Sequence, residues 1–176
     1  MIVLTGPSAS GKTSIVIKLV KNYGYSKVIT TTTRSPRVGE MDGVDYHFVS
    51  VIKFLKDKKN NEFIETIFYN GNYYGTTRSE ISGKKVLIVD IKGANTFYEE
   101  LGNRLTFCYI DAKDEIKCQR MQERGDSEST IRSRINDDKK VFVKENMSHI
   151  DFYIDTSDKT IDECAKEIID KCEVKK

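Results

Sequence analysis

The sequence predicts an α/β fold in which helices flank a parallel sheet, and three observations indicate it. Residues 2–4, 86–89 and 105–110 are short apolar runs, which is typical of strands buried on both faces of a sheet. Residues 15–23 carry apolar side chains at helical spacing, and Gly24 is placed to end that helix. The first apolar run leads through a glycine-containing loop directly into this helix, so the chain opens with a complete strand–loop–helix unit.

The loop after the first strand has the spacing of a phosphate-binding P-loop. Gly6 and Gly11 are separated by four residues, and Lys12 and Thr13 follow. The glycines let successive N–H groups point at an anion, and the start of the helix adds its positive end. Lys12 would reach the β- and γ-phosphates of ATP, and the Thr13 hydroxyl would ligate Mg²⁺. The fold is therefore of the P-loop NTPase type, and the predicted ATP-binding residues are Gly6, Pro7, Ser8, Ala9, Ser10, Gly11, Lys12, Thr13 and Ser14.

Length and composition fit one soluble globular domain. The chain has 176 residues, of which 38% are hydrophobic and 32% charged. The net charge of +2 gives no indication of a nucleic-acid or membrane partner, and no apolar run has the length of a membrane span. Without a signal peptide, the expected location is cytoplasmic. Four cysteines without a CxxC pair and two histidines predict reduced thiols and no zinc site, whereas monomer and homodimer both stay open.

The segment 30–48 places two arginines among hydroxyl groups. Arg34 and Arg37 can each offer a planar fork of donors to a phosphate monoester, and Thr30 and Tyr46 can add neutral hydrogen bonds. A solvated basic turn before a hairpin strand explains the same residues equally well.

Together, the P-loop and this segment resemble the guanylate kinases, which transfer the γ-phosphoryl group of ATP to GMP. The family signature Thr-Thr-Arg-x-Pro-Arg-x-Gly-Glu matches residues 32–40, and its Gly-x-Asp-Tyr-x-Phe matches residues 43–48. The resemblance implies that Arg34, Arg37 and Tyr46 hold the GMP phosphate, with Thr30 where the family usually has serine.

The resemblance continues through residues 60–78, where the family reads the base. It implies that Glu65 accepts hydrogen bonds from the guanine N1–H and 2-amino groups, that Thr76 contacts O6, and that Tyr74 binds the phosphate. A carboxylate suits two donors that guanine has and adenine lacks. From the residues alone, the better interpretation of Glu65 would be an ordinary carboxylate on the solvent face of a strand.

The resemblance also implies how a single guanylate kinase-like domain, residues 1–176, is divided. Residues 1–33 and 84–176 would form the core, with a helical lid at about 120–134. Residues 34–83 combine many turn glycines with short alternating runs and would form an inserted β-rich lobe that binds GMP.

Asp90 stands at the end of the apolar run 86–89, where a central strand would deliver a carboxylate to the nucleotide site. It is predicted to bind GMP and to match the first aspartate of the family motif Leu-Asp-Ile-Asp-x-Gln-Gly. Because Lys92 and Gly93 follow, the second aspartate is expected to be absent, so that either the site tolerates its loss or base selectivity is looser. A simple turn residue is the alternative.

The lid is expected to supply arginines to the phosphoryl group. Arg120 and Arg124 lie one turn apart on a predicted helix 114–124, and Arg134 lies on a following helix that opens at Ile131. The resemblance places lid arginines at these positions, although a solvated charged helix would look similar. The predicted catalytic residues are Lys12, Arg34, Arg120, Arg124 and Arg134.

Residues 152–154 predict a last strand, and Thr160 with Glu163 predicts a capping box that opens a C-terminal helix. Asp155 stands where the family has an asparagine near the adenine of ATP, which leaves that contact in doubt.

The resemblance implies Mg²⁺-assisted in-line transfer from ATP to GMP, and to dGMP as well, giving ADP and GDP in purine nucleotide metabolism. Two alternatives remain: a non-catalytic phosphopeptide-binding module of guanylate kinase type, and a P-loop kinase for another nucleotide or a sugar phosphate.

Overall fold

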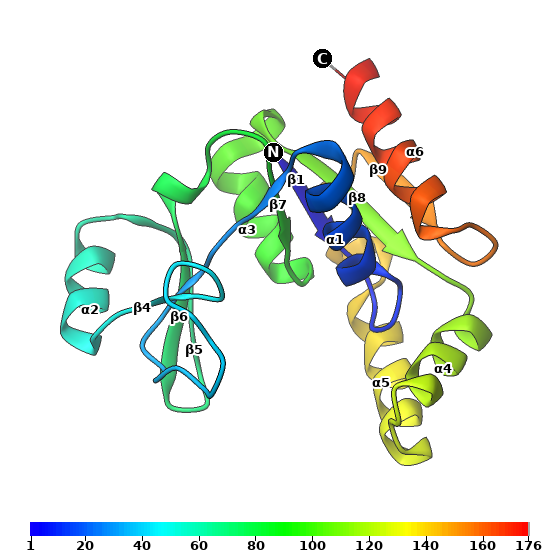
Figure 1. Cartoon of the computed structure of the whole chain (residues 1–176), viewed down its shortest axis with the longest axis horizontal. Helices are drawn as coiled ribbons and strands as arrows, with labels where there is room; N and C mark the ends of the chain where they lie inside the picture. The colour runs from blue at the N-terminus through cyan, green and yellow to red at the C-terminus, as the bar shows by residue number, and fades with distance from the viewer. Residues whose placement is uncertain (176) are drawn as a thin grey trace.

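A computed structural model describes residues 1–175, and its centre is a five-stranded parallel sheet (Figure 1). The order across the sheet is β2-β7-β1-β8-β9, and every neighbouring pair is parallel. The predicted α/β fold with a parallel sheet is confirmed. The five strands are β1 (Ile2–Thr5), β2 (Ser26–Lys27), β7 (Lys85–Ile88), β8 (Thr106–Asp111) and β9 (Phe152–Asp155).

Helices cover both faces of this sheet because its strands are apolar on both sides. Ile2 and Leu4 pack with α1 (Lys12–Tyr23) and α6 (Ile161–Val174), whereas Val3 faces α3 (Ile91–Leu101) on the opposite side. Alternate side chains of a strand point to opposite faces, so each strand supplies both cores. The predicted stop of α1 is confirmed at Gly24, which has φ +68°, and the predicted capping box of Thr160 and Glu163 opens α6.

A second sheet lies beside the core, on the left in Figure 1, in the strand order β4-β3-β6-β5. Its strands are β3 (Thr31–Thr32), β4 (His47–Phe48), β5 (Phe63–Tyr69) and β6 (Asn72–Thr77). Strand β3 covers two residues of the threonine run 30–33. Strands β4, β5 and β6 fall within the segment whose sequence suggested an inserted lobe, whereas β3 lies in residues 1–33, which were assigned to the core. The boundaries 34 and 83 stay predictions.

The helix α2 (Val51–Lys59) in this region was not predicted from the sequence. It presents a single buried side chain, Phe54, which stacks on Phe63 at 4.4 Å and on Tyr73 at 5.4 Å between ring centroids. One buried residue in nine gives little helical periodicity to read.

Two further helices, α4 (Asp114–Glu123) and α5 (Glu128–Val141), project at the lower right of Figure 1. The expected helix ending at Gly125 is close to α4, whereas α5 begins three residues before the expected Ile131 because the Ser127 side chain caps it. Met121, Ile131 and Ile135 form a small cluster that packs against Ala9 of the P-loop.

Short 3₁₀ turns complete the chain at η1 (Arg78–Glu80), η2 (Gly102–Arg104) and η3 (Lys144–Asn146). All four cysteines are unpaired thiols. Within residues 1–175, none of the helices combines the length and apolar character needed to cross a membrane.

Candidate active site

The P-loop connects β1 to α1 and depends on glycine at two positions. Gly6 has φ +142°, and a Cβ there would lie 1.9 Å from the Ile110 carbonyl oxygen on the neighbouring strand β8. Gly11 has φ +97° and caps the start of α1. Because L side chains rarely adopt such angles, the sequence can form this loop only with glycine at these sites.

Lys12 lies across the loop that precedes it. Its Nζ donates to the carbonyl oxygens of Gly6 at 2.7 Å and Pro7 at 2.6 Å, and to the Ser10 Oγ at 3.2 Å. Burial lowers the pKa of Lys12 to about 8, and the charges of Asp138 and Asp111 oppose this shift. The ammonium group is therefore held where phosphate oxygens could replace its carbonyl partners.

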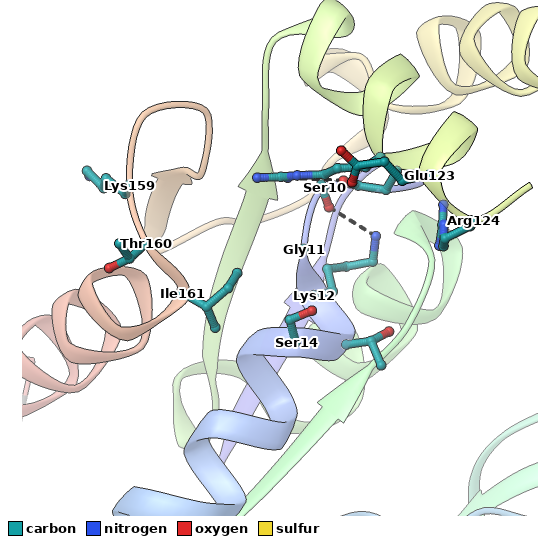
Figure 2. A pocket seen from close by; sticks show the side chains of 12 residues that line it. Ser10, Gly11, Lys12, Ser14, Glu123, Arg124, Lys159, Thr160 and Ile161 are labelled. Atoms are coloured by element: carbon teal, nitrogen blue, oxygen red, sulfur yellow. Dashed lines mark hydrogen bonds between the residues drawn. The ribbon is translucent and has the colours of Figure 1, made fainter.

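A cavity of about 450 Å³ opens above this loop (Figure 2). Figure 2 shows Lys12 and Ser10 between the end of α4, with Glu123 and Arg124, and the start of α6, with Thr160 and Ile161. The lining residues are Ala9, Ser10, Gly11, Lys12, Thr13, Ser14, Arg120, Glu123, Arg124, Lys159, Thr160 and Ile161. Most of the predicted ATP-binding residues therefore share one cavity.

The three predicted lid arginines occupy different surroundings. Arg120 donates to the Ala9 carbonyl at 3.1 Å and to the hydroxyl and carbonyl of Thr156, both at 2.9 Å. Arg124 follows the last residue of α4 and lies 4.0 Å from Asp126. Arg134 lies 3.4 Å from the same carboxylate and does not line the cavity. In this conformation the cavity receives Arg120 and Arg124.

Thr156 joins the loop before α6 to the P-loop, a contact that the sequence did not reveal. Its buried hydroxyl donates to the Ser10 carbonyl at 2.9 Å. The neighbouring Asp155, which stands where the family has an asparagine near the adenine, accepts from the backbone and hydroxyl of Ser157 at 2.8 and 2.6 Å. The only available signal was the polar run Asp155–Ser157 after a strand.

A second cavity, of about 260 Å³, lies between the small sheet and the end of β7. It brings together Thr30, Glu65, Thr76 and Asp90, four of the residues predicted to bind GMP. The Thr76 hydroxyl donates to Glu65 at 2.9 Å, because the two residues pair across β5 and β6. Burial raises the pKa of Glu65, and the nearby charge of Asp90 adds to this effect.

The predicted phosphate-binding side chains gather around Arg34. Its Nη2 donates to both carboxylate oxygens of Glu40, at 2.8 and 2.9 Å, and its guanidinium lies 5.4 Å from the centre of the Tyr46 ring. The Tyr46 and Tyr74 rings meet edge to face at 6.2 Å. The Glu40 partner, helped by Tyr74, raises the pKa of Arg34. Arg37 is exposed, and the contact it makes with Glu40 comes from its backbone N–H.

The residues near the P-loop fit a metal that is held mainly by phosphate. Thr13 is exposed on the first turn of α1 beside the first cavity. Among residues 1–175, His, Cys, Asp and Glu side chains form no group of three that could hold a metal ion. Mg²⁺ typically takes one or two protein oxygens and completes its shell with phosphates and water, so this arrangement is compatible with it.

Comparisons with known proteins show which family the chain is similar to. The family model described as "Guanylate kinase" matches residues 1–173. A guanylate kinase from Desulfotalea psychrophila is 35% identical over 144 residues, which cover 77% of this chain and 71% of the relative. One from Fusobacterium nucleatum is 38% identical over 144 residues, covering 76% of each chain.

The chain belongs to the guanylate kinase family. The crystal structure of guanylate kinase from Anaplasma phagocytophilum superposes with a TM-score of 0.66 at 25% identity, covering 99% of this chain and 84% of the other. The resemblance inferred from the sequence is thereby confirmed.

Asp90 lies beside Glu65 in the second cavity, and its place in the aspartate motif stays a prediction. A Cβ on Gly93 would lie 3.0 Å from the Val89 Cβ, which explains a glycine there.

Proposed function

We propose that this chain transfers the γ-phosphoryl group of ATP to GMP, and to dGMP, giving ADP and GDP. The observation that carries the proposal is the pairing of two cavities. One is built on an intact P-loop, and the other contains Glu65, Thr76 and Asp90 as a set of acceptors and a hydroxyl suited to guanine.

In the donor cavity, the amides of residues 9–13 would hold the triphosphate and Lys12 would contact its outer phosphates. Mg²⁺ would be held by Thr13 together with phosphate oxygens, and it supplies positive charge to the transferring group when bound. Arg120 and Arg124 line the same cavity and add positive charge.

In the acceptor cavity, Glu65 would accept from the guanine N1–H and 2-amino groups while Thr76 contacts O6. Arg34, Arg37, Tyr46 and Tyr74 would bind the monophosphate, with Thr30 beside them. A site that pairs with guanine donors leaves a carboxylate unsatisfied when adenine enters, which disfavours AMP.

Transfer between these sites requires no protein nucleophile, because the GMP phosphate is already anionic. The residues of the chain align the acceptor oxygen with the γ-phosphorus and neutralise charge, through Lys12, Arg34 and the lid arginines. We further propose that residues 34–83 act as the GMP-binding lobe and residues 120–134 as a lid, with Arg134 reaching the phosphoryl group on closure.

A coupled assay of ADP formation with GMP, dGMP, AMP, CMP and UMP tests the proposal. We expect turnover with GMP and dGMP and far less with the others. Absence of turnover with every acceptor would defeat the nucleotide kinase and leave a phosphopeptide-binding module or a sugar-phosphate kinase, although an intact P-loop disfavours the binding module. Preference for AMP would defeat the guanine assignment.

A further inference from the structure

The P-loop contains a strained residue that is not glycine. Ala9 has φ +57°, in the left-handed region that L residues rarely occupy. Such a conformation persists only where the surrounding structure holds it in place.

Two long-range hydrogen bonds hold the chain on either side of Ala9. The backbone N–H of the preceding residue, Ser8, donates to the Asp138 carboxylate at 2.7 Å. The carbonyl of Ala9 accepts from Arg120 at 3.1 Å. Asp138 comes from α5 and Arg120 from α4, so each of these helices makes a hydrogen bond to one side of the turn.

The Asp138 contact involves no residue that lines the donor cavity. That cavity is lined by Ala9 to Ser14 of the loop, and neither Ser8 nor Asp138 is among its lining residues. The carboxylate accepts from the Ser8 amide, and its negative charge also acts on the Lys12 ammonium.

We propose that Asp138 is a positioning residue for ATP binding, which holds the Ser8 amide and thereby keeps the Ala9 turn in its phosphate-binding shape. This inference rests on the proposed use of the loop for ATP. It assigns to α5 a role that is separate from the lid arginines.

ATP binding, measured by calorimetry without GMP, tests the inference independently of phosphoryl transfer. Asp138→Ala removes the acceptor and should weaken ATP binding about tenfold, the scale of one hydrogen bond to a charged group, while GMP binding stays unchanged. Asp138→Asn keeps a carbonyl oxygen that can accept from Ser8 and should retain most of the affinity. The matched control is Asp137→Ala, which changes an exposed neighbour on α5.

A double-mutant cycle separates positioning from general stability. Ala9→Gly relieves the left-handed strain, so Asp138→Ala should cost clearly less ATP affinity in the Ala9→Gly background. An equal loss in both backgrounds, or unchanged or tighter ATP binding by Asp138→Ala, would overturn the inference.

Hydrogen exchange of the Ser8 amide in the unmutated protein keeps the test decisive if Asp138→Ala fails to fold. We expect protection of this amide against exchange, and exchange at the rate of an open loop amide would overturn the inference. A protein that binds ATP as described but transfers nothing to GMP would defeat the proposed function and leave this inference intact.

Discussion

The two cavities are built from different parts of the chain. The donor cavity is built on the P-loop, where Gly6 lies against β8 and Arg120 and Thr156 hold the loop by hydrogen bonds. The acceptor cavity is lined by side chains from the small sheet and from the end of β7, such as Glu65, Thr76 and Asp90. The P-loop depends on a few glycines at fixed spacing, whereas the acceptor cavity depends on which side chains meet in space.

The largest effect is expected from removal of the Lys12 side chain, which should affect the donor site and leave the acceptor site intact. Lys12→Ala should lower kcat by roughly 10³-fold, since a cation aimed at the transferring group is lost, while GMP binding remains near normal. Steady-state kinetics and GMP titration measure the two effects. Lys21→Ala, an exposed lysine at the other end of α1, is the control. Loss of GMP binding in Lys12→Ala would contradict the division of roles.

Replacing a glycine by alanine should lower the free energy of unfolding more in the donor loop than in the acceptor loop. Gly6→Ala drives a methyl group into the Ile110 carbonyl and should cost about 3 kcal/mol of unfolding free energy or prevent folding. Gly39→Ala, in the loop after Arg34, meets nothing within 4 Å and pays mainly for its φ of +88°, about 1 kcal/mol. Denaturant unfolding measures both changes. Equal costs would show that the donor loop is no more constrained than the acceptor loop.

Glu65→Ala should impair the acceptor site while leaving the donor site unchanged. Loss of the carboxylate should raise the KM for GMP roughly 10- to 100-fold, on the scale of hydrogen bonds to a charged group, with little change in the KM for ATP. Glu62→Ala, an exposed glutamate just before β5, is the matched control. A change confined to the KM for ATP would move Glu65 out of the acceptor site.

The smallest expected effect is a pH dependence confined to the acceptor site. The pKa of Glu65 is raised by burial and by Asp90, so as pH falls this carboxylate takes up a proton at a higher pH than an ordinary glutamate. The kcat/KM for GMP should therefore decline on the acid side, and Asp90→Asn should move that decline to lower pH. Glu65→Gln lacks the titrating group, so the same decline in that variant would assign it elsewhere.

The donor loop could be predicted from sequence because its determinants are local. Gly6, Gly11 and Lys12 stand at fixed spacing and need no distant partner. Asp138 and Thr156 could not be predicted, because they contact Ser8 and Ser10 across 130 and 146 residues.

In the acceptor region, the candidate site residues were predicted from the resemblance to a family, because the hydrophobic periodicity of the sequence does not indicate them. Glu65 looks like an ordinary strand carboxylate until Thr76 and Asp90 are seen beside it. Helix α2 was not predicted because Phe54 is its single buried side chain, and the sequence did not show that Asp90 would share a cavity with Glu65.

The pairing of Arg34 with Glu40 has a consequence for how an acceptor enters. Because the guanidinium already holds a carboxylate, a phosphate that binds there exchanges one anion for another. The gain in free energy is then the difference between a phosphate dianion and a tethered carboxylate monoanion. An anion that enters the acceptor loop would have to compete with Glu40 for the Arg34 guanidinium. The loop would therefore favour a phosphate dianion over a weakly binding monoanion such as chloride.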